Sequence, residues 1–149
     1  MASFSEQFQA FKVKALAEAE RKAKAVLLEV GDRLIDYSPI GKPETWKSVP
    51  PPGYEPGKFR GSWHHSMGTP STSTEETIDV TGSSSKAEFI EGIMAQPFGV
   101  HYFTSNVPYA LMLELGNHSK QVGPEGIVGK VVAEFPEIAR RIVPEGYGT

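Results

Sequence analysis

Apolar and charged residues follow a helical period over the first quarter of the chain. Apolar side chains recur every three or four residues, and lysines and glutamates fill most positions between them. This spacing is typical of an amphipathic helix, and we predict one over residues 3–37. Ser3 or Ser5 can cap its first turn, and Glu6 stands three residues after Ser3, as a capping box requires. Fully helical, this segment would extend roughly 50 Å at 1.5 Å per residue.

The N-terminal half of this predicted helix is rich in alanine and has few large apolar anchors. A helix that projects beyond its own core needs a partner to cover its apolar face. The alternative is a bent or two-piece helix that lies on its own sheet, with Gly31 weakening its end. The pattern alone leaves both arrangements open.

The periodicity stops at residue 38, and residues 38–61 are dominated by proline and glycine. Proline removes a backbone donor, so this segment can join a sheet only at an edge. Its length exceeds ordinary connections, which indicates a functional or a flexible loop. Trp46 and Tyr54 are large aromatic residues within it, and we expect them to dock on a neighbouring surface.

Alternating apolar and polar residues then predict strands, most clearly at residues 77–80. Serine- and threonine-rich segments separate these strands and have the composition of turns. No crossover helix is apparent between them, so we expect an antiparallel sheet within residues 62–105. The predicted strands are residues 62–68, 75–81, 86–95 and 98–105.

A short helix is predicted next. Asn106 is a good N-cap, Pro108 falls in the first turn, and Gly116 can adopt the left-handed conformation that ends a helix. Val107, Leu111 and a leucine four residues later would form its buried face.

A last amphipathic segment, interrupted by Pro136, predicts another helix and places helices over residues 106–143. Residues 1–149 are therefore expected to form one α+β domain. In this fold, an antiparallel sheet packs with a long N-terminal helix, a short central helix and a C-terminal helix.

Two motifs carry a resemblance to a known family. Pro108-Tyr109-Ala110 followed by Glu114-Leu115-Gly116 and a Ser-Lys loop resembles the tail-completion and head–tail connector proteins of tailed bacteriophages. Upstream, Ser38-Pro39-Ile40-Gly41 and Gly57-Lys58-Phe59-Arg60-Gly61-Ser62-Trp63 resemble that family's Pro-x-x-Thr-Gly-x-Leu-Arg-x-Ser-Trp block. This chain splits the block with a proline-rich insertion, places Phe59 at the usual leucine, and has Lys42 or Pro56 where threonine is expected.

The resemblance implies a structural virion protein of the phage neck, made in the host cytoplasm and lacking an active site. Such proteins form rings, usually hexamers, that complete the tail. The expected partners are further copies, a head-completion or connector protein, and a tail-tube or tail-terminator protein. Candidate interface residues are Trp46, Tyr54, Arg60, Trp63, Tyr109, Glu114, His118 and Lys120. A non-virion assembly adaptor or chaperone is the alternative, and an enzyme such as a cell-wall hydrolase is a third class.

Charge adds one further expectation. The chain has a formal charge of −3, and residues 71–98 contribute five acids against one lysine. Repeated around a ring, such an acidic segment would let DNA slide past without gripping its phosphates or reading its sequence. The alternative is a solvated outer face. The candidate channel residues are Glu75, Glu76, Asp79, Glu88 and Glu91.

Other chemistry finds little support in the sequence. There is no cysteine, which excludes disulfides and thiolate ligands. His64 and His65 are adjacent and would point to opposite faces of a strand, and Ser119-Lys120 lacks the spacing of a hydrolase dyad. No apolar run reaches the roughly 20 residues of a membrane span. We therefore expect no cofactor, no metal and no membrane contact.

Overall fold

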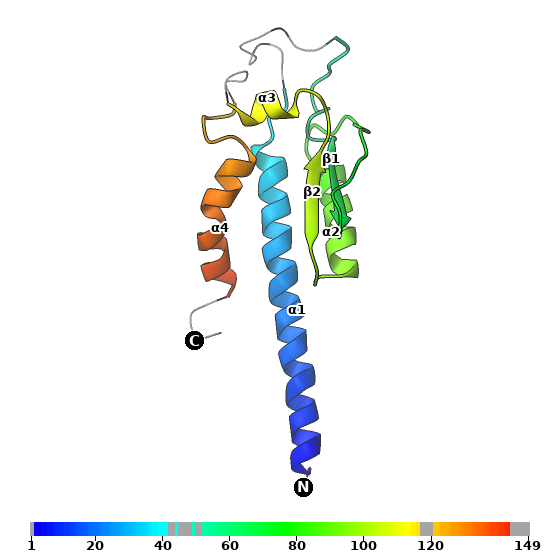
Figure 1. Cartoon of the computed structure of the whole chain (residues 1–149), viewed down its shortest axis with the longest axis vertical. Coiled ribbons are helices and arrows are strands. Elements are labelled where there is room, and N and C mark those ends of the chain that lie inside the picture. Colours follow the sequence, from blue (N-terminus) through cyan, green and yellow to red (C-terminus); the bar gives the residue numbers. More distant parts are fainter. Residues whose placement is uncertain (1, 42–43, 45–48, 50–51, 117–120, 144–149) are drawn as a thin grey trace.

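A computed structural model of the chain describes residues 2–41, 44, 49, 52–116 and 121–143. The described residues form helices on either side of a central long helix, with a small sheet on one side (Figure 1). Loops and a short helix gather at one end of the molecule. In chain order the elements are α1 (Phe4–Tyr37), β1 (Trp63–Met67), α2 (Ser83–Ala95), β2 (His101–Ser105), α3 (Ala110–Glu114) and α4 (Val128–Ile142).

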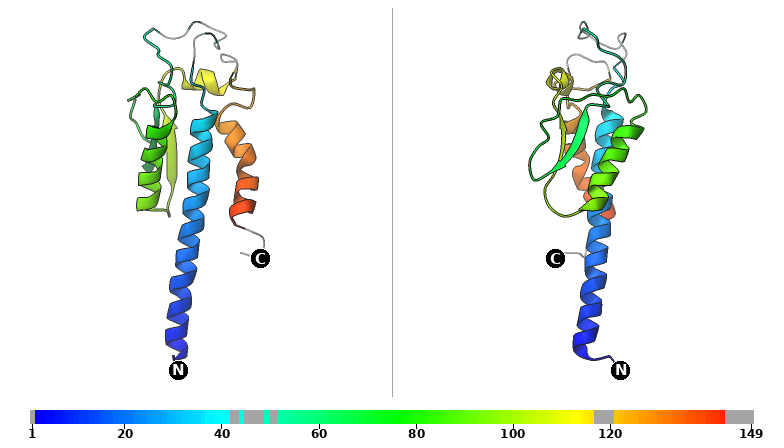
Figure 2. Two further views of the ribbon diagram at one scale, coloured as in Figure 1. Left: turned by 180° about the vertical axis from the view of Figure 1, so that it is seen from behind. Right: turned by 90° about the vertical axis from the view of Figure 1, so that its right-hand side faces the viewer.

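Helix α1 confirms the sequence prediction almost to the residue. Ser3 is its N-cap, and the reciprocal capping box with Glu6 is present in both directions, at 2.8 Å and 3.2 Å. The helix continues without a break for 34 residues, so the projecting arrangement is the one observed. All the views show its N-terminal half extending beyond the rest of the molecule (Figures 1 and 2).

The C-terminal half of α1 forms the centre of the fold. It packs against α2 on one side, where the β1–β2 strand pair also lies, and against α4 on the other (Figure 1). The core consists of large apolar side chains that these elements direct inward, because burial of their apolar surface is the main driving force for packing. Its residues are Leu34, Ile35, Phe59, Trp63, Phe89, Ile93, Val107, Tyr109, Leu113, Val122, Ile127 and Val131.

The sheet is smaller than the sequence predicted. Strands β1 and β2 pair antiparallel from Trp63 opposite Ser105 to Met67 opposite His101. The predicted strand at residues 75–81 is wrong: that segment makes only a single isolated bridge, in which Thr77 pairs with Gly61.

The predicted strand at residues 86–95 is also wrong, because these residues belong to α2. The helix start was missed because its stabilising side chain lies outside it. Asp79 accepts hydrogen bonds from the backbone amides of Gly82 (3.1 Å) and Ser85 (2.8 Å) at the first turn. Gly92 looks unfavourable in a helix, yet a Cβ atom there would lie 2.2 Å from the ring of His65, so the site requires a glycine.

The central helix is shorter than predicted, and it buries another face. Asn106 is not its N-cap; the Asn106 side chain donates instead to the carbonyls of Ser71 and Ser73. Leu111 is 68% exposed and Leu115 is 55% exposed, whereas Tyr109 and Leu113 are buried beside Val107. A five-residue helix has too few turns for a periodic apolar face, so the surrounding core decides which side chains are buried.

Helix α4 is present as predicted and contains Pro136 within it. Helices packed with an antiparallel strand pair make an α+β fold, which confirms the predicted class.

Candidate functional site

The residues that carry the family resemblance lie together at the loop end of the molecule, where residues 38–41, 52–62, α3 and 121–127 meet. Arg60 is the centre of the first group. Its guanidinium donates to the backbone carbonyls of Ser38 (2.9 Å), Val80 (2.7 Å) and Asp36 (3.5 Å). Two of these carbonyls belong to the C-terminal end of α1, whose last carbonyls have no partner within the helix. Arg60 therefore joins the end of α1 to the segment before α2.

Ser38 and Trp63 complete this group. The buried Ser38 hydroxyl donates to the Leu34 carbonyl at 2.6 Å and accepts from Trp63 Nε1 at 2.9 Å. Ser62 donates to the Phe59 carbonyl and pairs with the hydroxyl of Ser105 on β2. Trp63 is only 5% exposed. We expected Arg60 and Trp63 in an interface, but the structure places both in intramolecular contacts.

Glu114 and Gly116 form the second group. The Glu114 carboxylate accepts from the backbone amides of Ile127 (2.8 Å), Val128 (2.9 Å) and Gly129 (3.0 Å) at the start of α4. Gly116 has φ of 74°, and a Cβ atom there would lie 2.2 Å from the carbonyl oxygen of Gly123. The Glu-x-Gly motif thus connects α3 to α4, with Glu114 in the role of a cap supplied from another helix.

Two aromatic residues link the proline-rich loop to α3. The rings of Tyr54 and Tyr109 meet edge to face, with centroids 5.3 Å apart, and the Tyr109 hydroxyl donates to Glu76 at 2.5 Å. Burial, and then the neighbouring Glu76 charge, raise the pKa of Tyr54 to about 12. Tyr54 is half-buried within its own chain. Trp46, His118 and Lys120 lie outside the described residues.

The acidic segment does not present all its carboxylates to solvent. Asp79 is 5% exposed and caps α2. Burial alone would raise the pKa of Asp79, but hydrogen bonds, chiefly from Ser85, outweigh burial and lower it. Glu76 is engaged by Tyr109, and only Glu75, Glu88 and Glu91 are exposed. Asp79 is therefore not available to line a channel in this conformation.

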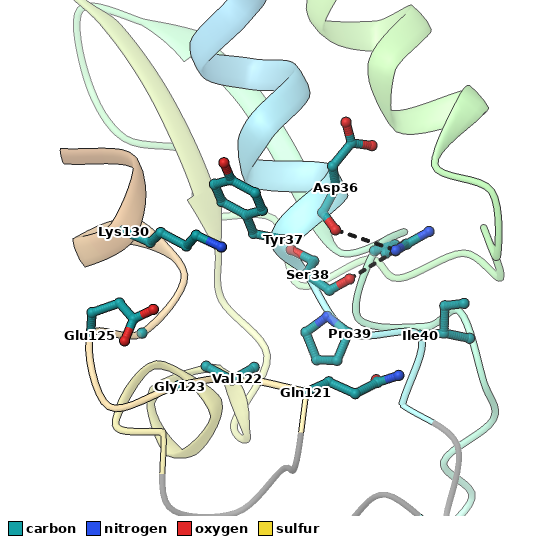
Figure 3. Close-up of a pocket in the computed structure, with 12 residues that line it drawn as sticks. Asp36, Tyr37, Ser38, Pro39, Ile40, Gln121, Val122, Gly123, Glu125 and Lys130 are labelled. Carbon is teal, nitrogen blue, oxygen red and sulfur yellow. Dashed lines mark hydrogen bonds between the residues drawn. The ribbon is translucent and has the colours of Figure 1, made fainter. Parts of the chain in front are cut away.

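A polar cavity of about 220 Å³ lies beneath the loop end (Figure 3). The end of α1 forms one wall, with Tyr37 and Ser38, and the loop before α4 forms another, with Glu125 and the nearby Lys130. The Lys130 ammonium lies 4.1 Å from the centroid of the Tyr37 ring. Arg60 also lines the cavity, but its guanidinium is hydrogen-bonded to backbone carbonyls and so has a structural role.

His65 on β1 and His101 on β2 form a pair across the sheet. His65 Nε2 lies 2.8 Å from His101 Nδ1, and His101 Nε2 is buried without a hydrogen-bond partner. Burial, together with the neighbouring His101, lowers the pKa of His65. His64 lies instead near Glu88, at 3.4 Å. Within the part of the chain that the structure describes, no three histidine or carboxylate side chains are arranged to hold a metal ion.

Sequence reasoning missed the polar network between α1 and α4. Arg33 pairs with Glu29 at 2.9 Å and with Glu134 at 3.0 Å, and Arg141 also contacts Glu29 at 2.9 Å. The Tyr37 hydroxyl donates to Glu134, and this hydrogen bond is the main reason that the pKa of Tyr37 is raised. Glu134 and Arg141 lie about a hundred residues from their partners on α1, so no local signal could have identified these contacts between the helices.

Comparison with protein-family models, with curated proteins and with solved structures found no match. Among the described helices, none combines the length with the apolar character that a membrane crossing requires.

Proposed function

We propose that this chain is a structural protein of the neck of a tailed bacteriophage, where it forms a ring that completes the tail and joins it to the head connector. One observation carries the proposal. Residues of both motifs that resemble the neck family, distant in sequence, are interlocked at one end of the fold. Arg60 and Trp63 hold the end of α1, while Glu114 and Gly116 join α3 to α4.

This arrangement supports the proposal because the residues that carry the resemblance have structural roles at one end of the fold. An arginine, a tryptophan, a glutamate and a glycine are needed at these positions to hold the fold, whatever surface the protein presents. The motifs therefore favour a fold shared with the neck family. The contacts between copies in a ring would then lie on other parts of the surface. A ring forms when one patch of each copy binds a different patch of the next and the rotation closes.

Within such a ring, we propose that Glu75, Glu88 and Glu91 face the DNA channel. These three carboxylates are exposed, and their segment carries few positive charges. A wall of this kind gives phosphates nothing to bind. A density map of the assembled neck tests the idea: if these carboxylates point to bulk solvent while lysines and arginines line the lumen, the acidic lining is wrong.

The function itself is tested in two steps. The native mass of the purified protein, from light scattering, should correspond to a closed ring. In addition, particles made without this protein should accumulate as separate heads and tails. The alternative, an assembly adaptor, predicts that the protein is required for joining but absent from purified particles. A protein that is neither in the particle nor needed for joining has another function.

A further inference from the structure

The N-terminal part of α1, residues 4–16, carries three exposed phenylalanines; we refer to it as the arm. Phe4 is 82% exposed, Phe8 is 50% exposed and Phe11 is 66% exposed. Every residue from 2 to 17 is exposed, and the arm extends beyond α2, the two strands and α4 (Figures 1 and 2). Three aromatic rings on one short helical segment are a large apolar surface without cover in the described chain.

A second apolar surface, which no described residue covers, follows directly along α1. A groove of about 530 Å³ is formed by the middle of α1 together with the α2–β2 connection and the end of α4. Ala19, Ala23 and Val26 form its floor on α1, and Pro97 and Val143 contribute to its sides. Its lining is mostly apolar, and its volume is in the range of pockets that hold large side chains or small ligands, roughly 300–1,000 Å³.

The arm and the groove differ in the size of their side chains. The residues concerned follow each other at steps of three or four, so both surfaces lie on one face of the same helix. Large rings at Phe4, Phe8 and Phe11 stand at one end of this face, and small side chains at Ala19 and Ala23 leave hollows at the other. Large and small side chains that interdigitate allow close packing of two helices.

The groove cannot be filled by the arm of its own chain. Both belong to one unbroken helix, and Phe8 and Ala23 are separated by roughly 22 Å along its axis at 1.5 Å per residue. An arm that fills the groove must therefore come from another copy of the chain. A membrane fits the arm less well, because helices that lie on lipid carry a polar face rich in lysine and arginine. The arm instead combines Glu6 with Lys12 and Lys14.

We propose that the arm of one copy of this protein packs into the α1 groove of a second copy. Buried aromatic side chains cover about 150–250 Å² each. With about two thirds of the three phenylalanines exposed, the arm offers roughly 300–500 Å² to a partner. Every copy carries both an arm and a groove. A closed assembly buries both, which gives more than half of the about 800 Å² per partner of a stable interface.

This contact allows two assemblies. In one, two copies exchange arms and their α1 helices are antiparallel. In the other, each arm binds the groove of the next copy around a ring. The proposal does not rest on the phage assignment, because it needs only a second copy of the chain.

Point variants in the full chain test the contact. Phe8→Ser should weaken self-association about tenfold or more in sedimentation measurements, because loss of one central aromatic anchor commonly has an effect of this size. Ala19→Glu should do the same by placing a charge in the groove. Ala17→Glu is the matched control: it makes the same change two residues earlier, about 200° around the helix, and should leave association unchanged. Circular dichroism should show the same helix content in all three variants.

Cross-linking then tests which surfaces meet. The chain contains no cysteine, so each introduced thiol is unique. A mixture of Ser5→Cys and Ala23→Cys proteins, in which all three phenylalanines are kept, should form mixed disulfide dimers under mild oxidation, and a mixture of Ser5→Cys and Ala17→Cys proteins should not.

Two results would overturn the proposal. The first is a wild-type protein that stays monomeric well above micromolar concentration, whether or not its arm binds lipid vesicles. The second is that the Phe8→Ser and Ala19→Glu variants associate like the wild-type protein. If a ring forms and these variants leave it intact, the arm contact is wrong while the ring survives. If this contact is found but the protein is absent from phage necks, the proposed function is wrong and the contact between copies stands.

Discussion

Replacement of Glu114 by alanine tests the idea that the central motif holds the fold. The change leaves the backbone amides of Ile127, Val128 and Gly129 without their acceptor. It also removes a negative charge from the N-terminal end of α4, where the helix dipole favours one. We expect a native but less stable protein in which the contact between α3 and α4 is loosened.

The magnitude follows from the three hydrogen bonds. The amides of Ile127 and Gly129 are partly buried, and a buried donor left unpaired costs roughly 1–3 kcal/mol. Val128 is exposed, so water can replace Glu114 there. The lost charge adds about 0.3–1 kcal/mol. Since these contributions overlap, we expect a total loss of about 2–4 kcal/mol in the free energy of unfolding.

Chemical denaturation of the purified protein measures this free energy directly, and thermal unfolding supports it. For a chain of this size, each kcal/mol lowers the melting temperature by about 2–4 °C. Glu114→Gln is an informative second variant. It keeps one side-chain oxygen as an acceptor but turns an NH₂ group towards one of the amides, so it should lose about half as much stability.

Glu137→Ala is the matched control, because Glu137 lies exposed on α4 and should change stability by no more than about 0.5 kcal/mol. If Glu114→Ala is as stable as this control, the carboxylate does not cap α4 in solution. The structural explanation of the motif would then have to be abandoned.

Three further predictions concern single positions. Gly116→Val should lower the free energy of unfolding by about 2–4 kcal/mol, because a β-branched residue resists positive φ and its Cβ would meet the Gly123 carbonyl. An unchanged melting temperature in that variant would contradict this account. The pKa of His65 is lowered from its ordinary value of 6.5, so the unfolded chain binds the proton more readily, and this residue's contribution to stability is present above pH 6.5 and is lost as the pH falls below it. His65→Gln should flatten that part of the stability–pH curve, and a curve with an unchanged slope would contradict the assignment to His65. Tyr54→Ala should destabilise the isolated protein by about 1–3 kcal/mol in denaturant titration, since the ring packs within its own chain; loss of assembly with full stability would favour the interface role predicted from the sequence.

The elements that could be predicted from the sequence are those whose signals are local. The capping box of α1 needs only Ser3 and Glu6, three residues apart, and the helical period then continues to Tyr37. Helix α4 shows its period clearly despite Pro136. The positive φ of Gly116 was likewise predictable, because it depends on the residue type and on the end of a helix.

Tertiary structure decided what the local pattern left ambiguous or misrepresented. Helix α2 looks like a strand with serine-rich turns, but Asp79 caps it from the preceding loop and His65 fills the space beside Gly92. Which face of α3 is buried depended on the core around Tyr109 and Leu113, since five residues make little more than one turn.

The same distinction applies to the candidate site. The sequence showed that Arg60 and Glu114 belong to motifs, and it suggested an interface for both. Their partners are backbone groups from other segments of the chain. These groups lie 13 to 15 residues from Glu114 and 20 to 24 residues from Arg60. Backbone carbonyls and amides occur in every residue, so the sequence carries no mark of which of them a charged side chain will reach. Only the folded chain, which brings the end of α1 to Arg60 and the start of α4 to Glu114, determines that these two residues hold the fold together.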